Sequence, residues 1–426
     1  MYREEQLKAL LEGRRILIAG YGREGKSAER LIQRLVPEAE YVIADGNEQI
    51  AAEAAKGYDL IIKSPGVPMR VMGGVECSSL TDIFLQVYGD TTIGVTGTKG
   101  KSTTASLIHH LLPSSILAGN IGIPLFDILD ELKEGSVVVA ELSCHQLENI
   151  HRGPHVAVLL NLFQEHLDHY ENYMGYKMAK MQIGLKQREG DHFFWCSDAT
   201  ELDELVRSQA MPGVLHPYSL NDITEEEKSL LAACPLEGEH NRSNALVACR
   251  VVRTMKEELR TKNGLPADSL SSYRLLLGSF QGLRHRMEKV GEVAGITWYD
   301  DSISTIPAAA IAAVKALGRV DTLILGGFDR GIDYTPLVDF LKENPVKNVV
   351  FVGAAGRRIY NTLSPFTFHL SPLLEDDYTK IVPWCAEHTP EGGVVLLSPA
   401  AASYDAFKNF EVRGDFFREQ IMKLKV

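Results

Sequence analysis

Short apolar runs alternate with amphipathic, helix-like segments along the whole chain. The runs RILIAG at 15–20, TTIGV at 91–95 and TLILGG at 322–327 are rich in Val, Ile and Leu, and a helix-like segment follows each of them. Continuous apolar runs of this length are typical of strands buried on both faces of a parallel sheet. The alternation therefore predicts βαβ units and an α/β chain whose sheets are mostly parallel.

Two interruptions divide this alternation into three predicted domains. One follows the helix-like stretch SSLTDIFLQVYG, which ends at Gly89, and the other lies near 272–279, after the polar stretch NGLPADSLSSY. A chain of 426 residues is long enough to bury several cores. The predicted domains are a Rossmann-like N-terminal domain at 1–88, a central P-loop ATPase-like domain with a mostly parallel sheet at 89–277, and a C-terminal Rossmann-like α/β domain at 278–426.

Charge and cysteine content exclude several classes of protein. The formal net charge is -12 and the basic residues form no stripe, which argues against a nucleic acid partner. The six cysteines are scattered without a CxxC pair, so we expect neither a disulfide framework nor a cysteine zinc site. The N-terminal stretch lacks the apolar segment of a signal peptide, and no apolar run approaches the roughly 18 residues of a membrane span. These features predict a cytoplasmic protein without membrane insertion.

The stretch GYGREGKS at 20–27 fits two phosphate-binding patterns at once. It reads as G-x-G-x-x-G, the dinucleotide pattern, and as G-x-x-x-x-G-K-S, the ATP pattern. Asp45 ends the next predicted strand, where an acidic residue meets the ribose in dinucleotide sites. Taken alone, the stretch leaves both interpretations open, and the first of them would suit a nicotinamide-dependent oxidoreductase.

A second glycine-rich loop, TGTKGKSTT at 96–104, follows a predicted strand and opens a predicted helix. It departs from the strict ATP pattern because Val95 stands where the first glycine is required. Lys101 nevertheless supplies a charge for the β- and γ-phosphates, and Ser102 supplies a hydroxyl for Mg²⁺. Glu141 ends the strand-like run SVVVAE, where open α/β sheets place their ligands. We therefore predict ATP and Mg²⁺ at this loop.

The stretch EHLDHY at 165–170 brings His166, Asp168 and His169 close together in the sequence. Such a group could bind zinc, but a third strong ligand at suitable spacing is not evident, and the stretch belongs beside the predicted Mg²⁺ site. We therefore expect His169 to be a structural residue and expect no zinc here.

The order of these motifs resembles the Mur ligase family of ATP-dependent, amide-forming enzymes. The stretches that carry the resemblance are TGTKGKSTT, GNIG at 119–122, ELS at 141–143, EHLDHY, YKMAK at 176–180, EHNRSNAL at 239–246 and LRHRME at 283–288. The resemblance covers the whole chain, and LSPAAASYDAFKNFEVRG at 397–414 is most similar to the members that add D-glutamate.

The resemblance implies a reaction and its substrates. ATP would phosphorylate the carboxylate of UDP-N-acetylmuramoyl-L-alanine, the amine of glutamate would attack the acyl phosphate, and the intermediate would release phosphate. Two Mg²⁺ ions and a carbamylated lysine belong to this implied chemistry, which serves peptidoglycan precursor synthesis. We expect small-molecule substrates and a monomeric chain.

The resemblance also implies roles for individual residues by position. The implied catalytic residues are Lys101, His166, Lys180 and Arg286. The implied ATP-binding residues are Gly97, Thr98, Lys99, Gly100, Lys101, Ser102, Thr103, Asn241, Asn244, Arg286 and Asp301. The implied residues for the UDP substrate are Gly22, Arg23, Glu24, Asp45, Asn120 and His166. The implied residues for the amino acid are Thr305, Arg330, Ser403, Tyr404 and Phe410. The implied metal ligands are Ser102, Glu141, His166 and carbamylated Lys180.

Four positions depart from the family's pattern. Ile303 and Arg330 stand where many members carry lysine, Tyr404 replaces a leucine, and Cys144 replaces a serine. The first three border the implied amino-acid pocket, so a ligase that adds another amino acid, such as L-glutamate, remains an alternative. A folate acceptor is disfavoured by the UDP-type first domain. An oxidoreductase would leave the second loop and Glu141 without a purpose, and a non-catalytic nucleotide-binding protein is the remaining alternative.

Overall fold

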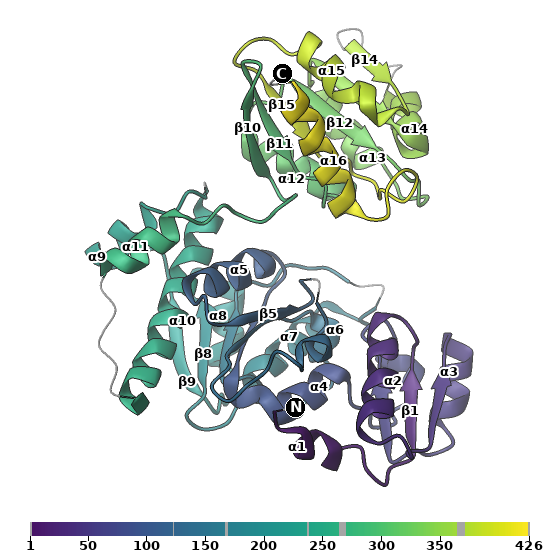
Figure 1. Ribbon diagram of the computed structural model, residues 1–426, viewed down its shortest axis with the longest axis vertical. Helices are drawn as coiled ribbons and strands as arrows, with labels where there is room; N and C mark the ends of the chain where they lie inside the picture. The colour runs from purple at the N-terminus through teal and green to yellow at the C-terminus, as the bar shows by residue number, and fades with distance from the viewer. Residues whose placement is uncertain are drawn as a thin grey trace. The chain divides into compact units, whose positions relative to one another are not determined.

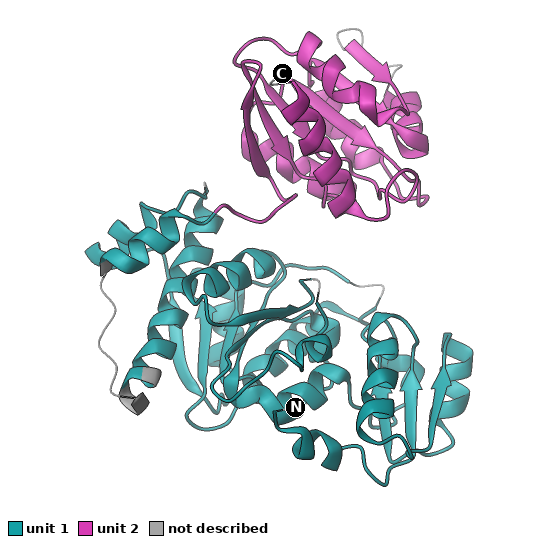
Figure 2. Ribbon diagram, in the orientation of Figure 1, with its two compact units in different colours: residues 1–280 teal, residues 281–426 magenta. Residues whose placement is uncertain are grey.

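The computed structural model describes residues 2–121, 123–166, 169–236, 238–263, 270–363 and 371–424. The chain divides into two compact units, residues 1–280 (unit 1) and residues 281–426 (unit 2) (Figure 2). Unit 1 contains two sheets and unit 2 contains one, so each of the three predicted domains has a sheet of its own. The domain boundaries themselves, including the one near Gly89, remain predictions.

The first sheet of unit 1 is formed by the three strands expected from RILIAG, YVIAD and YDLIIKSPG. β1 lies between β2 and β3 and pairs with both in parallel, with Ile16 opposite Tyr41 and Leu60. The strands are β1 Ile16–Ala19, β2 Tyr41–Ala44 and β3 Leu60–Lys63. The helices are α1 Glu4–Ala9, α2 Arg23–Leu35, α3 Asn47–Ala54, η1 Met69–Met72 and α4 Leu80–Tyr88. The stretch GYGREGKS and α2 follow directly after the carboxyl end of β1, the central strand of this sheet.

The second sheet of unit 1 has six parallel strands among the described residues, in the order β5-β6-β4-β7-β8-β9. Three of them, β5, β8 and β9, are labelled in Figure 1. The strands are β4 Thr92–Thr96, β5 Ile116–Gly119, β6 Val138–Glu141, β7 Val156–Leu159, β8 His192–Cys196 and β9 Val214–Tyr218. The chain runs from β4 to β5 on one side and later continues to β7 on the other. The carboxyl end of β4 therefore lies at a switch in strand order, where open α/β sheets bind ligands.

Helices cover both faces of this second sheet. Ile93 and Val95 of β4 share an apolar cluster with α5 and α10, whereas Val138 and Ala140 of β6 share a cluster with α6, α7 and α4. The segments are η2 Gly89–Thr91, α5 Lys101–Leu111, η3 Leu125–Ile128, α6 Cys144–Leu147, α7 Tyr173–Leu185, α8 Thr200–Arg207, α9 Glu225–Leu231, α10 Glu239–Asn263 and α11 Leu270–Gly278. The cluster that includes α4 also includes Ile16 of β1, so the two sheets of unit 1 share one continuous core.

Unit 2 is a six-stranded sheet in the order β10-β11-β15-β12-β13-β14, with helices on both faces. β10 pairs antiparallel with β11, and the other pairs are parallel. The strands are β10 Glu288–Val293, β11 Ile296–Asp300, β12 Thr322–Gly326, β13 Asn348–Val352, β14 Ser371–Leu374 and β15 Val394–Leu397. The helices are α12 Pro307–Leu317, α13 Thr335–Glu343, α14 Gly353–Leu363, α15 Tyr378–His388 and α16 Phe410–Lys423. The predicted α/β class with mostly parallel sheets is confirmed.

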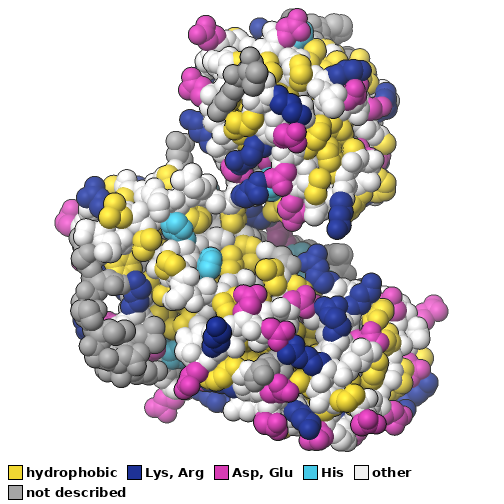
Figure 3. All heavy atoms as spheres, in the orientation of Figure 1, with side chains coloured by type: hydrophobic (Ala, Val, Ile, Leu, Met, Phe, Trp, Pro, Cys, Tyr) yellow, Lys and Arg dark blue, Asp and Glu magenta, His cyan; other side chains and the backbone are white. Residues whose placement is uncertain are grey.

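On the face drawn in Figure 3, basic and acidic side chains are interspersed over each unit rather than gathered by sign. Among the described residues, no helix combines the length and the apolar character needed to cross a membrane.

Candidate active site

The loop TGTKGKSTT lies between β4 and the N-terminus of α5. Gly97 and Gly100 have φ angles of 153° and 85°, values that favour glycine, and Gly100 caps α5. A Cβ atom at Gly100 would lie 2.8 Å from Oδ1 of Asn244, so the start of α10 packs closely against the loop. The backbone N–H groups at the start of α5 have no partner within their own helix, which makes this end suited to an anion.

Asn161, which follows β7, holds the loop in shape. Its side-chain oxygen accepts a hydrogen bond from the backbone N of Lys99 (2.8 Å), and its side-chain nitrogen donates to the carbonyl oxygen of Lys99 (3.1 Å). The backbone carbonyl oxygen of Asn161 also accepts a hydrogen bond from the backbone N of Thr98 (3.0 Å). Sequence reasoning missed Asn161, although a polar residue just after a parallel strand was a usable signal.

Two predicted lysines converge on the same loop carbonyl. Nζ of Lys101 donates to the carbonyl oxygens of Gly97 (3.0 Å) and Thr98 (2.9 Å), and Nζ of Lys180 donates to that of Gly97 (2.9 Å). Lys180 is only 2% exposed, and burial, with a further contribution from Lys101, lowers its pKa to about 7. The side chain of Lys101 and a readily deprotonated amine, that of Lys180 on α7, therefore meet at the Gly97 carbonyl.

Glu141 lies at the carboxyl end of β6, beside the loop. In the parallel ladder it is opposite Val95 of β4, and its side chain is 2% exposed. Oε1 accepts a hydrogen bond from Nδ2 of Asn120 (2.9 Å), whereas buried Oε2 has no hydrogen-bond partner among the described residues. A buried carboxylate oxygen without a donor is costly, and a cation would compensate for it. Glu141, with Ser102 in the first turn of α5, fits the oxygen-rich donor set that Mg²⁺ prefers.

A group of aromatic side chains adjoins this edge of the sheet. The ring of His145 lies 4.9 Å from that of His166 and 4.2 Å from that of His169, measured between centroids. His166 has a φ angle of 58°, an uncommon value for a residue other than glycine. Burial, followed by the charges of His169 and His166, lowers the pKa of His145 to about 3, so His145 is neutral. His145 was not predicted from the sequence.

His169 takes part in a buried network with Glu148 and Lys63. Its Nε2 lies 2.7 Å from Oε1 of Glu148, whose Oε2 lies 3.1 Å from Nζ of the buried Lys63. Within the described part of the chain, no third ligand joins His166 and His169 at metal-binding distance. Asp168 lies outside the described residues. This arrangement agrees with the structural role expected for His169.

GYGREGKS forms the tight turn between β1 and α2. Gly20 has a φ angle of 91°, and a Cβ atom at Gly25 would collide with the carbonyl oxygen of Gly20. The backbone N of Tyr21 donates to Oδ1 of Asp45 (3.1 Å), so Asp45 lies beside the loop as expected. Gly22, Arg23 and Glu24 form the start of α2.

Glu24 connects this loop to the central sheet. Its Oε1 accepts a hydrogen bond from Nε2 of Gln146 on α6 (3.0 Å), and burial raises its pKa. Asn120, which donates to Glu141, is solvent-exposed. Within unit 1, these contacts hold Glu24 against α6 and Asn120 against the carboxyl end of β6.

The adenine-side residues predicted on α10 also lie at the loop. Asn244 is 6% exposed, and its Nδ2 lies 3.5 Å from Oδ1 of Asn241. Thr98, in the loop itself, contacts α7 instead, because its hydroxyl lies 2.7 Å from the hydroxyl of Tyr176. Thr103 lies in the first turn of α5.

In unit 2, Arg286 and Asp301 lie near each other at the carboxyl end of β11. Asp301 accepts hydrogen bonds from the backbone N of Met287 (3.1 Å) and from the hydroxyl of Ser398 (2.7 Å). Burial raises its pKa to about 6, an effect that Arg286 and these hydrogen bonds partly offset. Nε of Arg286 is buried without a hydrogen-bond partner among the described residues.

The residues predicted for the amino acid lie on loops of unit 2. Nη2 of Arg330 donates to the carbonyl oxygen of Thr305 (2.9 Å), which brings these two residues together. Ser403 is buried, and its hydroxyl has no partner in the described part of the chain, whereas Tyr404 is 65% exposed. Phe410 begins α16, and its carbonyl oxygen accepts a hydrogen bond from Ser302 (2.8 Å).

Arg413, which sequence reasoning missed, holds this loop in place. The side chain is 1% exposed and donates to the carbonyl oxygens of Ala401 (3.1 Å), Ala402 (3.2 Å) and Ser302 (2.8 Å). Its Nε donates to the Ser302 hydroxyl (2.9 Å). Because carbonyl and hydroxyl oxygens occupy its donors, Arg413 stabilises the loop that carries Ser403 rather than offering a free charge.

Comparison with known proteins agrees with this fold and this loop. A family model described as "Mur ligase middle domain" matches residues 95–252, from β4 to α10. The chain belongs to the Mur ligase family and is a ligase, as predicted. It is 34% identical to the UDP-N-acetylmuramoyl-L-alanine--L-glutamate ligase of a Micromonospora species, over 96% of this chain and 97% of that protein. It is 30% identical to the UDP-N-acetylmuramoylalanine--D-glutamate ligase of Thermoanaerobacter pseudethanolicus, over 97% and 99%. The oxidoreductase alternative is thereby wrong.

Solved structures show the same fold at lower sequence identity. MurF from Acinetobacter baumannii superposes with a TM-score of 0.58 at 16% identity, covering 98% of each chain. MurF from Thermotoga maritima, solved in complex with ADP, gives a TM-score of 0.55 at 17% identity and covers 96% of this chain and 93% of that one.

Proposed function

We propose that this ligase joins glutamate to UDP-N-acetylmuramoyl-L-alanine with ATP, in cytoplasmic peptidoglycan precursor synthesis. The observation that carries the proposal is the loop at the switch point of the central sheet, where Lys101 and Lys180 gather with Oε2 of Glu141, an oxygen that has no hydrogen-bond partner among the residues described. Such a loop suits phosphoryl transfer, which depends more on positioning and charge neutralisation than on a protein nucleophile.

Each group of residues in unit 1 has a proposed task. The loop from Gly97 to Thr103 binds the phosphates of ATP, with Asn241 and Asn244 on the adenine side. The GYGREGKS loop, with Asp45, binds the diphosphate and uridine of the substrate, and Asn120 and His166 lie toward its reacting end. The N-terminus of α2 suits the diphosphate as that of α5 suits the triphosphate.

Two Mg²⁺ ions fit the donor atoms of this site. Ser102 and Glu141 would hold one, and His166 with a carbamylated Lys180 would hold the other. Bound there, the ions would neutralise charge on the phosphate oxygens. Burial of the Lys180 amine supports the carbamate, because a neutral amine is the form that adds CO₂.

The proposed reaction has two chemical steps. The substrate carboxylate displaces ADP from the γ-phosphorus of ATP and forms an acyl phosphate. The uncharged amine of the amino acid then adds to the acyl carbon, loses a proton, and the tetrahedral intermediate expels inorganic phosphate to leave the amide. Lys101 and Arg286 are proposed to stabilise the negative charge that moves onto oxygen.

We propose D-glutamate as the amino acid, on the likeness of LSPAAASYDAFKNFEVRG to the D-glutamate-adding members. Thr305, Arg330, Ser403, Tyr404 and Phe410 are its proposed contacts, and an arginine suits a carboxylate. L-glutamate is the second candidate, because two of the similar relatives, at 34% and 32% identity, are L-glutamate ligases. Relatives named as D-glutamate ligases reach 33% identity, so identity does not separate the two enantiomers.

Phosphate release tests the proposal directly. The purified chain is supplied with ATP, Mg²⁺ and UDP-N-acetylmuramoyl-L-alanine, together with D-glutamate, L-glutamate or no amino acid. Release that requires one enantiomer identifies the acceptor, whereas no turnover with either enantiomer contradicts the proposed function. The product is identified by its mass.

The two glycine loops are separated by one pair of variants. Lys101→Ala should abolish turnover, because it removes the charge at the proposed triphosphate loop, whereas Lys26→Ala should mainly raise the KM for the UDP substrate. Isothermal titration with a non-hydrolysable ATP analogue gives the ATP affinity of each variant. Equal loss of that affinity in both variants would contradict the division of tasks between the loops.

A further inference from the structure

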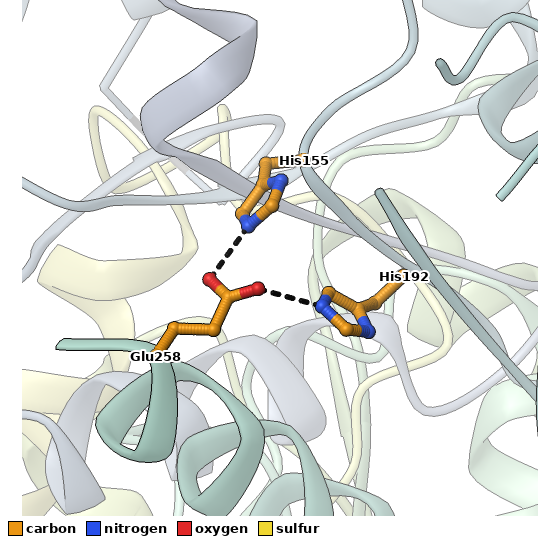
Figure 4. Close-up of side chains that lie close together, drawn as sticks. All are labelled: His155, His192 and Glu258. Carbon is orange, nitrogen blue, oxygen red and sulfur yellow. Dashed lines mark hydrogen bonds and ion pairs between the residues drawn. The ribbon is translucent and has the colours of Figure 1, made fainter. Parts of the chain in front are cut away.

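Two histidines and one glutamate meet at the amino-terminal edge of the central sheet (Figure 4). His155 immediately precedes β7, His192 opens β8, and Glu258 projects from the second half of α10. Nε2 of His155 lies 2.8 Å from Oε2 of Glu258, and Nε2 of His192 lies 2.7 Å from Oε1 of Glu258. Each carboxylate oxygen thus faces one imidazole nitrogen.

Additional side chains fix the orientation of both rings. Nδ1 of His155 lies 2.9 Å from Oδ1 of Asp191, a carboxylate that Arg152 also binds. Nδ1 of His192 lies 2.8 Å from Nε2 of His216 on β9. With both Nδ1 atoms engaged, both Nε2 atoms are directed at Glu258. Histidine ligands of metal ions are typically held in this way, by a partner on the nitrogen opposite the metal.

The group is enclosed but reachable from solvent. The side chains of His155, His192 and Glu258 are 16%, 14% and 26% exposed. One ligand atom from each lies within 4.8 Å of the others, so all three can turn toward one point. Two imidazole nitrogens and one carboxylate form a donor set that zinc commonly accepts, with water as the fourth ligand.

The group is separate from the proposed nucleotide site. β7 runs from Val156, next to His155, to Leu159, two residues before Asn161, so the two sites lie at opposite ends of the strands. Along α10, Glu258 is 14 residues from Asn244, which corresponds to roughly 21 Å of helix. Its imidazole donors also distinguish it from an oxygen-rich Mg²⁺ site.

We propose that His155, His192 and Glu258 bind a zinc-like divalent transition-metal ion. The ion takes the place of the protons that the imidazoles share with the carboxylate. It links α10 to the amino-terminal ends of β7 and β8. Its role is structural, because the site lies far from the proposed chemistry and joins segments that are distant in the sequence.

Cobalt binding tests the proposal. The full chain carrying His166→Ala, which removes an imidazole at the nucleotide site, is treated with chelator, dialysed and titrated with Co²⁺ in excess Mg²⁺. One equivalent should bind, with the visible absorption of low-coordinate Co²⁺. When Glu258→Gln is combined with His166→Ala, the Kd for Co²⁺ should rise by about 100-fold or more. Glu257→Gln, which changes the exposed neighbour on α10, should leave this Kd unchanged. Failure to bind, or equal binding with Glu258→Gln, would overturn the proposal.

A second measurement needs no variant and so does not depend on whether Glu258→Gln folds. Crystals of the wild-type chain are soaked in a zinc salt, and anomalous differences are recorded on both sides of the zinc edge. A zinc peak bonded to both Nε2 atoms and to Glu258 supports the site. Zinc found elsewhere but absent from this position overturns it.

Discussion

The amine of Lys180, which contacts the glycine-rich loop at 96–104, has a strongly lowered pKa. It lies on the buried side of α7, and its hydrogen bond to Gly97 leaves it facing the loop rather than solvent. With a pKa of about 7, half of this amine is neutral near pH 7, whereas an exposed lysine is almost fully protonated there. Position in the family motif suggested a special lysine, but only burial in the folded chain explains why its chemistry differs.

Lys180 should therefore form a carbamate. At a fixed pressure of ¹³CO₂, a carbamate signal in the ¹³C NMR spectrum should grow as the pH rises from 6 to 8, because the amine loses its proton over this window. Lys180→Met should abolish the signal. Lys177→Met is the matched control on the same helix, since Lys177 pairs with Glu201 at 2.9 Å. A signal that survives in Lys180→Met would assign the carbamate elsewhere.

Asp301 should make unfolding depend on pH in unit 2. Its pKa is raised from 3.8 to about 6, so between these values the folded chain binds a proton more readily than the unfolded chain. The free energy of unfolding therefore falls as the pH rises through this window. Asp301→Asn removes the ionisation and should stabilise unit 2 by up to about 3 kcal/mol at pH 8, with a much smaller effect at pH 4. Urea titration at the two pH values measures this, and a stabilisation of equal size at both would contradict it.

The strand–loop–helix element occurs twice in unit 1, and both copies could be predicted. The runs before each loop and the helical spacing after it are visible in the sequence, as are the strands that became β1 to β4, β6 to β8, β11 to β13 and β15. β5, β9, β10 and β14 were not predicted. All four lie at the edges of their sheets. β9 contains Pro217, β14 contains Pro372 and β10 is largely polar, so these three strands lack the continuous apolar run of a central strand.

The first loop should tolerate alanine at one glycine and not at another. A Cβ atom at Gly25 would collide with the carbonyl oxygen of Gly20, whereas one at Gly22 meets nothing within 4 Å. Gly25→Ala should lower the free energy of unfolding by about 1–3 kcal/mol and weaken binding of the UDP substrate. Gly22→Ala, where φ is −74°, should cost less than about 1 kcal/mol. Equal losses from the two variants in urea titrations would show that close packing at Gly25 is not the cause.

At the scale of the whole molecule, the chain consists of two units with separate cores. All six strands of the last sheet lie within 288–397, and the apolar clusters that cover its faces are drawn from unit 2 alone. Unit 1 differs, because residues of both its sheets belong to one apolar cluster. Composition and strand counting could not reveal this difference, which depends on the packing of α4 against the central sheet.

Residues 281–426 should therefore fold without the rest of the chain. Expressed alone, this fragment should unfold in urea in one cooperative transition, followed by fluorescence of the fully buried Trp298. The full-length chain carrying Trp195→Phe provides the comparison, because only tryptophans of unit 2, Trp298 and Trp384, then contribute to the signal. A fragment that shows no cooperative transition would mean that unit 2 depends on contacts from unit 1.

The sequence alone determined the α/β class, the two glycine-rich loops that follow β1 and β4, and the family. These features follow from local patterns: apolar periodicity, glycine spacing and the order of motifs. Only the tertiary structure decided which side chains become buried partners. The contacts of Asn161 with Lys99, of Asn120 with Glu141 and of Arg413 with Ala401 all join segments that are distant in the sequence, as does the group of His155, His192 and Glu258. Burial and hydrogen bonding depend on which segments meet, and single-sequence patterns do not contain that information.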